Sequence, residues 1–382
     1  MVDFDLTPFD REMLRLTHEQ ALIARTHARS YDGLDELYVP DELPEAKDHP
    51  NVRQVIKERV GEASGAAILD IMIYLEEMWG TIPFRKGSNE ATFLGSKLVE
   101  VLGSPEQYER WKSMGMAIAL TEPGAGSDPS RIRTMACQDE ETGEWVVNGE
   151  KIFISLAHSC QAIVLFGLAR TAEGIVPGIF VVEKGTRGLS ISPQLKKLGQ
   201  RGWDTANLHF SECRIPAGNR LMGNMKNMLP PFNVSRPWVA AIGLAFARAS
   251  LDLTRDWFEK KGMMPDYRFD AAPADWRTHR FLELEAEYEA CWLTLLHTKW
   301  IEDMRGADKL EAAMTKAQSG GATRRIINGC MELLGPESAS EAHLMEMWLR
   351  DSRVCDIYEG AGEVNRLIIA RDLLGYSPKE LA

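Results

Sequence analysis

The stretch EWVVNGEKIFIS, residues 144–155, decides the fold, because it belongs to a strand-like region in the middle of a chain whose two ends have helical patterns. Valine, isoleucine and phenylalanine dominate this stretch, and Asn148-Gly149 supplies a turn signal inside it. Short runs of the same character follow: QAIVLFGLAR (161–170), VPGIFVVEK (176–184), GLSISP (188–193) and ANLHFSECRI (206–215). Short strands at this spacing predict a compact β-barrel or sandwich in the middle of the chain.

Helical patterns occupy the two ends of the chain. Apolar residues recur at steps of three and four in REMLRLTHEQALIARTHA (11–28) and AAILDIMIYLEEMWG (66–80). Long amphipathic patterns that predict a helical bundle cover residues 238–261, 281–304, 310–335 and 341–354. The sequence therefore predicts an α+β fold, mostly α. We expect an N-terminal helical domain (1–116), a central β-barrel domain (117–228) and a C-terminal four-helix bundle (229–382).

Composition narrows the class of protein. The 382 residues are 45% apolar and 26% charged, which is typical of a soluble globular protein. A net charge of −12 argues against a nucleic-acid surface, which needs clustered Lys and Arg. The six cysteines are scattered without metal-ligand spacing, which indicates reduced thiols and predicts no metal site. The acidic N-terminus does not resemble a signal peptide, and no apolar run approaches the roughly 20 residues that span a bilayer. We expect a cytoplasmic protein without membrane insertion.

A glycine-containing stretch, ALTEPGAGSDPS (119–130), is the first candidate site. Gly124 and Gly126 allow a tight bend and a close approach to a ligand, and Thr121, Ser127 and Asp128 place polar groups beside them. The stretch is not a Walker loop, because no G-K-[ST] follows, nor does a strand–loop–helix unit surround it. A turn that only feeds the strands is the simpler interpretation.

An aromatic and a hydroxyl residue form the second candidate site. Phe153 and Ser155 are two residues apart on a predicted strand, so their side chains point to the same face. That face suits a planar heterocycle, although routine barrel packing explains the pattern equally well.

Two further stretches place single charged residues near predicted helix starts. In PFNVSRPWVAA (231–241) we expect a helix to start at Ser235-Arg236-Pro237, where Arg236 meets the positive end of the helix dipole. An anionic ligand explains that location, and so does a surface ion pair. In CDIYEGAGEVNR (355–366), Glu359 is either a surface acid near a helix N-terminus or a catalytic base.

Taken together, the four motifs resemble the acyl-CoA dehydrogenases, in the order and spacing of that family and over essentially the whole chain. The resemblance implies the family's helical–barrel–helical fold, bound FAD, and oxidation of an acyl-CoA thioester to its 2,3-enoyl form. It implies that Glu359 removes the proton next to the thioester carbonyl while a hydride passes to flavin N5. A carboxylate in a water-poor pocket has a raised pKa, which makes it a stronger base.

The resemblance also carries over binding positions. It implies flavin contacts at Leu120, Thr121, Gly126, Ser127, Phe153, Ser155, Ala361 and Glu363. It implies substrate contacts at Ser127, Phe232, Asn233, Arg236, Tyr358 and Gly360. Phe153 stands where many relatives have Trp, and Ala361 stands where Thr is usual, so one hydroxyl contact is lost. Electron-transfer flavoprotein is the expected electron acceptor.

The sequence departs from the family where a neighbouring subunit grips the FAD pyrophosphate and adenosine. In FEKKGMMPDYR (258–268), Lys261 replaces an Arg, and Met264-Pro265 replace Phe-Gly. In ELLGPESAS (332–340), Glu332 replaces a Gln, and of the glycines only Gly335 remains. Pro336 removes a backbone donor, and two carboxylates facing a diphosphate are unfavourable.

These losses predict a hetero-oligomer in which a related subunit completes the FAD site. The arrangement resembles the α2β2 acyl-CoA dehydrogenases of bacterial steroid catabolism, so a bulky, steroid-derived acyl group is expected by analogy alone. A divergent homo-oligomer remains the alternative, as does an acyl-CoA oxidase or flavin monooxygenase on the same fold. A non-catalytic subunit is disfavoured, because the chain retains Glu359.

Overall fold

The computed structural model describes residues 5–33, 51–63, 65–79, 90–172, 174–222, 225–263, 267, 275–377 and 380. Its N-terminal helices are α1 (Pro8–Thr26), α2 (Ala28–Asp32), α3 (Val52–Arg59), α4 (Ala66–Met78), α5 (Glu90–Leu102) and α6 (Pro105–Trp111). Two of them begin with capping boxes, in which Thr7 and Asp10 or Ser104 and Gln107 satisfy each other's backbone N–H groups. Local sequence alone therefore sets where α1 and α6 start.

The middle of the chain forms one sheet, whose strands are β1 (Met116–Ala119), β2 (Met135–Gln138), β3 (Trp145–Ser155), β4 (Ala162–Thr171), β5 (Gly174–Glu183), β6 (Leu189–Ile191), β7 (Thr205–Ile215) and β8 (Arg220–Leu221). The order is β6-β7-β3-β2-β4-β5-β8, with β1 also paired to β4. Within the described strands β6 and β8 end this order, so the hydrogen bonding is that of an open sheet.

Strands β1 and β2 occupy successive parts of the same edge of β4. Ala119 pairs with Leu165 and Met135 pairs with Leu168, both in parallel. The chain between them, residues 120–134, therefore leaves the sheet and returns to the same edge. This topology presents the ALTEPGAGSDPS stretch as a loop at one place on the sheet.

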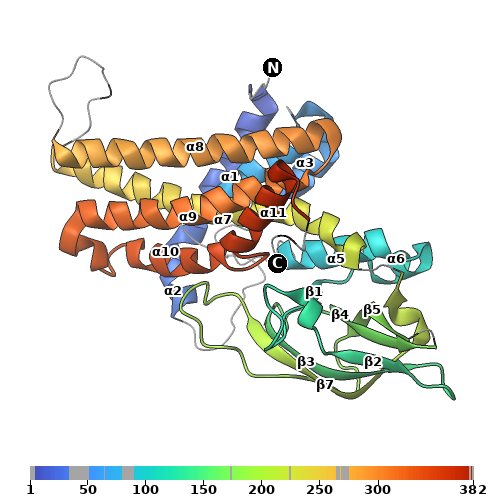
Figure 1. The fold of residues 1–382 in the computed structure, drawn as a ribbon. Helices are drawn as coiled ribbons and strands as arrows, with labels where there is room; N and C mark the ends of the chain where they lie inside the picture. Colours follow the sequence, from blue (N-terminus) through green and yellow to red (C-terminus); the bar gives the residue numbers. More distant parts are fainter. Residues whose placement is uncertain are drawn as a thin grey trace.

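Helices form the rest of the molecule and lie above the sheet in Figure 1. They are α7 (Met225–Lys260), α8 (Trp276–Arg305), α9 (Lys309–Leu334), α10 (Met345–Ser352) and α11 (Gly362–Leu374). Helices α7, α8 and α9 pack on one another and α11 packs on α9. These observations confirm the predicted fold class, α+β and mostly α, with a β region between N-terminal and C-terminal helical regions of the chain.

The predicted helix start at Ser235 is wrong. Helix α7 begins at Met225, so Ser235, Arg236 and Pro237 lie well inside it, together with Pro230 and Pro231. A proline inside a helix removes a backbone hydrogen bond and disfavours the helix there. Burial offsets that cost, because α7 packs against α4, α8 and α9 along its length. The expected conflict of Arg236 with the helix dipole therefore does not arise.

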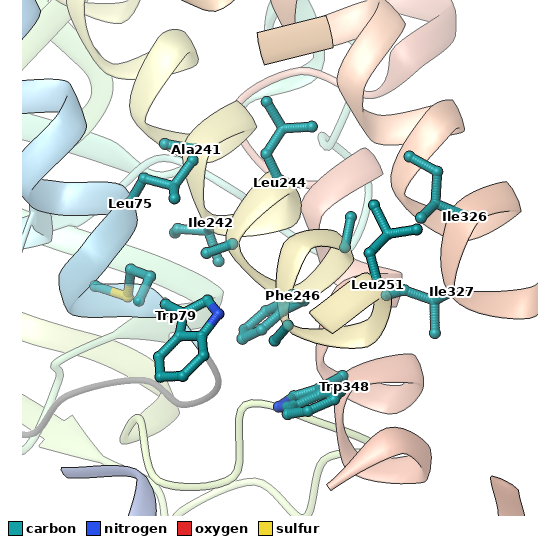
Figure 2. Close-up of a cluster of buried hydrophobic side chains, with 14 of the residues drawn as sticks. Leu75, Trp79, Ala241, Ile242, Leu244, Phe246, Leu251, Ile326, Ile327 and Trp348 are labelled. Atoms are coloured by element: carbon teal, nitrogen blue, oxygen red, sulfur yellow. The ribbon is translucent and has the colours of Figure 1, made fainter. Parts of the chain in front are cut away.

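The helical core joins the two ends of the chain. Figure 2 shows Leu75 and Trp79 at the end of α4 beside Ile242 and Phe246 of α7, with Trp348 of α10 next to them. The sheet has apolar clusters of its own, one of which contains Trp111 of α6 and Phe166 of β4. The N-terminal helices thus belong to both the bundle and the sheet. Among the described residues, no helix is both long enough and apolar enough to cross a membrane.

The loop between β6 and β7 fastens the sheet to the helices near the chain end. Gln200 donates its backbone N–H to Asp351 Oδ1 at 2.5 Å and its side-chain amide to the Asp351 carbonyl at 3.0 Å. A Cβ added to Gly199 would lie 2.3 Å from the Arg350 carbonyl, so only glycine fits there. Because Asp351 precedes Glu359 by a short segment, this contact fixes the position of that segment relative to the sheet.

Candidate active site

Glu359 lies in a left-handed turn just before a helix. Its φ is +55° and that of Gly360 is +93°, and α11 starts only at Gly362 with Ala361 as N-cap. A non-glycine residue with positive φ is uncommon and needs support from its surroundings. Asn365, fully buried in the first turn of α11, gives that support by donating its amide to the Gly360 carbonyl at 2.8 Å. Glu359 is therefore held outside the helix by a specific turn.

The Glu359 carboxylate faces α7. Ser235 Oγ donates a hydrogen bond to Glu359 Oε2 at 2.5 Å, and the positive charges of Lys316 and Arg236 act on the same carboxylate. Burial raises the pKa of Glu359, although the Ser235 hydrogen bond and the two cations oppose the rise. The group is a carboxylate with more than ordinary basicity.

Arg236 is buried rather than in a surface ion pair. It is 6% exposed, and its guanidinium donates to Asn233 Oδ1 of the same helix at 3.1 Å. Its Nε is buried and has no hydrogen-bond partner among the described residues. Burial lowers the pKa of Arg236, and the negative charge of Glu359 opposes that change. Of the two alternatives for Arg236, the surface ion pair is wrong.

The loop at the edge of the sheet is fixed by a buried ion pair. Glu122 accepts from Lys151 Nζ at 2.7 Å and from the backbone N–H groups of Arg133 and Thr134 at 2.7 and 3.0 Å. Lys151 also donates to the Leu120 carbonyl at 2.9 Å. Burial lowers the pKa of Lys151 to about 8. Burial opposes ionisation of Glu122, but the hydrogen bonds from Lys151 and the loop N–H groups lower its pKa overall.

Neither member of this pair was predicted as a functional residue. The signal was present, because TEPGAGSD contains Glu122 and NGEKIFIS contains Lys151, one charge of each sign in neighbouring motifs. Their pairing across the sheet edge gives the loop its shape.

The two loop glycines face open space. Glu122 and Ala125 exchange both backbone hydrogen bonds at 3.1 Å, which makes a tight turn around Gly124. A Cβ added to Gly124 or Gly126 would meet nothing within 4 Å, and Gly126 and Ser127 are exposed. Thr121 ties the loop to β3, because its carbonyl accepts from the Ile152 N–H at 2.9 Å. A ligand can therefore approach the backbone of this turn closely.

Phe153 stands out from the sheet at a β-bulge. The pairing of β3 with β7 shifts register between Lys151 and Ile154, and Phe153 adopts a φ of +58°. Its ring is 65% exposed, whereas Ile154 is buried and Ser155 is partly buried. The Phe153 ring is therefore free to contact a ligand at the edge of the sheet. The bulge breaks the regular alternation of the strand here, so the shared face of Phe153 and Ser155 stays a prediction.

The remaining predicted positions lie in different settings. Leu120 and Phe232 both pack against the apolar cluster around α5, which links the sheet-edge loop to α7. Tyr358 is partly buried against the helical core, with its hydroxyl 3.9 Å from Cys355 Sγ. Glu363 is exposed and pairs with Arg366 at 3.7 Å. Two hydrogen bonds, Ser235 to Glu359 and Asn365 to Gly360, hold the adjacent residues Glu359 and Gly360 in place.

The chain resembles known proteins in both its sheet region and its C-terminal helical region. The family model of the acyl-CoA dehydrogenase middle domain matches residues 117–213, and the model of the C-terminal domain matches residues 225–374. Human mitochondrial short-chain specific acyl-CoA dehydrogenase is 30% identical over 336 residues, which cover 82% of this chain and 79% of the relative. The chain belongs to the acyl-CoA dehydrogenase family. Its members are FAD-dependent oxidoreductases.

Solved structures of acyl-CoA dehydrogenases have the same fold. Butyryl-CoA dehydrogenase from Megasphaera elsdenii superposes with a TM-score of 0.78 at 20% identity, covering 98% of this chain and 100% of that one. A glutaryl-CoA dehydrogenase from Mycobacterium smegmatis in complex with FADH2 gives a TM-score of 0.77 at 20% identity, with coverages of 98% and 96%.

Several residues at which this chain departs from its family also lie close together. Glu337 accepts from Trp257 Nε1 at 2.5 Å and pairs with Lys261 Nζ at 3.6 Å. Glu332 and Pro336 are exposed beside it, and Gly335 adopts a φ of +62°. Met264 and Pro265 lie outside the described residues. The Lys261 ammonium is thus already engaged by a carboxylate of the same chain.

Proposed function

We propose that this chain catalyses the α,β-dehydrogenation of an acyl-CoA thioester, with Glu359 as the catalytic base. The observation that carries the proposal is the Glu359 carboxylate, which burial makes more basic and which a left-handed turn holds against Ser235. Glu359 takes the proton from C2, and the electron pair of that bond forms the 2,3 double bond as the hydride leaves C3. When bound, FAD supplies the hydride acceptor at N5.

The residues around the sheet edge fit a flavin. The turn at Gly124–Gly126 leaves space for a ligand to approach the backbone closely. Phe153, two residues before Ser155, presents an exposed aromatic ring. We assign the flavin ring to Leu120, Thr121, Gly126, Ser127, Phe153 and Ser155, with Ala361 and Glu363 reaching it from the start of α11. The Glu122–Lys151 pair keeps the loop in this shape.

We assign the acyl-CoA to the surface around Glu359. The buried Arg236 Nε has no hydrogen-bond partner in the described part of the chain, which supports a polar or anionic ligand group at this end of α7. Phe232 and Asn233 lie one turn before it, while Tyr358 and Gly360 flank the base. Ser127 belongs to both the flavin surface and the substrate surface.

The base assignment is tested with Glu359→Gln. General base catalysis contributes about 10²- to 10⁴-fold, so kcat should fall by that factor while FAD content and the free energy of unfolding stay close to those of the wild type. Glu341→Gln, which changes an exposed acid elsewhere on the chain, is the matched control. Unchanged turnover in Glu359→Gln would show that another group removes the proton. Rapid peroxide formation in air with substrate would instead identify an oxidase.

We further propose that a related subunit completes the FAD site. The supporting observation is that the Glu337 carboxylate accepts a hydrogen bond from Trp257 and pairs with Lys261. A negative charge therefore lies in the region that binds the cofactor in the family. The FAD-to-chain ratio of the assembled complex decides between one and two kinds of subunit.

A steroid-derived or similarly bulky acyl group follows from this oligomer analogy. Electron-transfer flavoprotein is the proposed electron acceptor, and the proposed location is the cytoplasm.

A further inference from the structure

Lys316 is a fully buried lysine close to the Glu359 turn. It lies on α9 with no exposed surface, and its Nζ makes one long hydrogen bond, 3.5 Å to the Gly360 carbonyl, among the described residues. Burying an ammonium group without a close ion pair is costly. The side chain therefore needs a partner at longer range to offset that cost.

The Gly360 carbonyl receives two side-chain donors from different helices. Asn365 of α11 donates at 2.8 Å and Lys316 of α9 donates at 3.5 Å. Gly360 directly follows Glu359, and both residues have positive φ. These two donors hold the turn from which the Glu359 side chain projects.

Charged groups face this turn from three elements. Arg236 comes from α7, Lys316 from α9, and Asp356 from the short helix η6 (Arg353–Asp356), where the Cys355 thiol also lies. Asp356 Oδ1 is wedged between α9 and α11, because a Cβ on Gly320 or Gly362 would lie 2.6 Å from it. Burial lowers the pKa of Lys316, but Cys355, Asp356 and Glu359 oppose that change, so the ammonium form has negative neighbours that stabilise it.

We infer that Lys316 is a positioning residue for the base. It holds the Gly360 carbonyl, and its buried charge keeps the Glu359 carboxylate ionised in a site where little water reaches it. Arg236 of α7 also acts on Glu359, but of these two cations Lys316 is the one that also bonds the Gly360 carbonyl. The inference rests on the proposed function only in calling Glu359 the base.

Two variants separate the charge from the hydrogen bond. Lys316→Met removes both, whereas Lys316→Gln keeps a donor for the Gly360 carbonyl and removes the charge. Because a nearby cation lowers the pKa of a carboxylate, both variants should move the acid limb of the kcat/KM profile to higher pH by about one unit. Lys316→Arg should leave the limb in place. Lys299→Met, which removes a buried lysine of α8 that pairs with Glu302, is the matched control and should not move it.

A second readout does not depend on turnover. The infrared carbonyl band of protonated Glu359 is identified in the purified holoprotein as the band missing from Glu359→Gln, and its pH midpoint is measured in each variant. The midpoint should rise in Lys316→Gln and stay in Lys316→Arg. If the limb and the band both stay in place in Lys316→Gln, the inference is overturned. If Glu359→Gln remains active, the proposed function fails, and the infrared midpoints still decide the role of Lys316.

Discussion

At the scale of single residues, the candidate site depends on opposing effects on one carboxylate. Burial favours the protonated form of Glu359, while Ser235, Lys316 and Arg236 favour the ionised form. The net effect is a raised pKa, so the base is more basic than an exposed glutamate and still ionises. Since only the ionised form accepts a proton, activity should increase as pH rises through the pKa of Glu359.

Ser235→Ala tests one of these contributions. The variant removes a hydrogen bond to the ionised carboxylate, so the pKa of Glu359 should rise. Hydrogen bonds to charged groups contribute about 1.5–3 kcal/mol, which corresponds to a shift of about one to two pH units. The acid limb of the kcat/KM profile should move to higher pH by that amount. Ser235→Thr keeps the hydroxyl group and serves as the control. An unmoved limb in Ser235→Ala would show that the Ser235 hydrogen bond does not stabilise the ionised carboxylate.

At the scale of elements, the loop at residues 120–134 depends on the ion pair between Glu122 and Lys151, which come from two different sequence motifs. Glu122 sits in the loop and Lys151 on β3, and both are buried at 2.7 Å from each other. The loop has few apolar contacts of its own, since Gly124, Gly126 and Ser127 are exposed. The ion pair and its hydrogen bonds to the backbone thus replace an apolar core for this segment.

Lys151→Met should destabilise the protein more than its volume change suggests. Breaking a buried ion pair leaves an unpaired charge and costs about 3–5 kcal/mol in the free energy of unfolding. The double variant Lys151→Met/Glu122→Gln removes that unpaired charge and should recover part of the loss. Urea unfolding of the single and double variants measures the coupling energy, and FAD content reports on the loop. Additive effects of the two substitutions would show that the pair does not fix the loop.

Much of the fold was predictable because periodicity and turn residues act locally. The strand runs between Glu144 and Ile215 appear as β3 to β7, and the amphipathic patterns appear as helices. The start of α7 was not predictable from local rules, because burial against three other helices outweighs the prolines near Ser235. The Ser235 hydrogen bond and the Lys316 contact join residues far apart in sequence, so no local sequence pattern predicts them. The individual flavin and substrate contacts stay predictions.

At the scale of the whole molecule, the two ends of the chain share one helical core. Helix α4 packs on α7 and α8, and α10 packs on α7 and α9, so the segment that leads to Glu359 rests on both ends of the chain. The Gln200–Asp351 contact adds the sheet to this arrangement. The position of Glu359 therefore depends on all three parts of the molecule, while the Lys261–Glu337 cluster lies in a separate part of the bundle.

That separation leads to a prediction about assembly. If Glu337 disfavours a pyrophosphate, this chain expressed alone should hold little FAD, and co-expression with a related chain should give one FAD per two different chains. Glu337→Gln removes the carboxylate that would repel the diphosphate, and with Lys261 released it should raise FAD retention of the chain alone. Glu341→Gln, a nearby exposed acid, is the control and should have no effect. Flavin absorbance per chain and native mass measurement give both ratios. Full FAD occupancy and turnover by the chain alone would rule out the two-chain site and leave a homo-oligomer that binds FAD through other contacts.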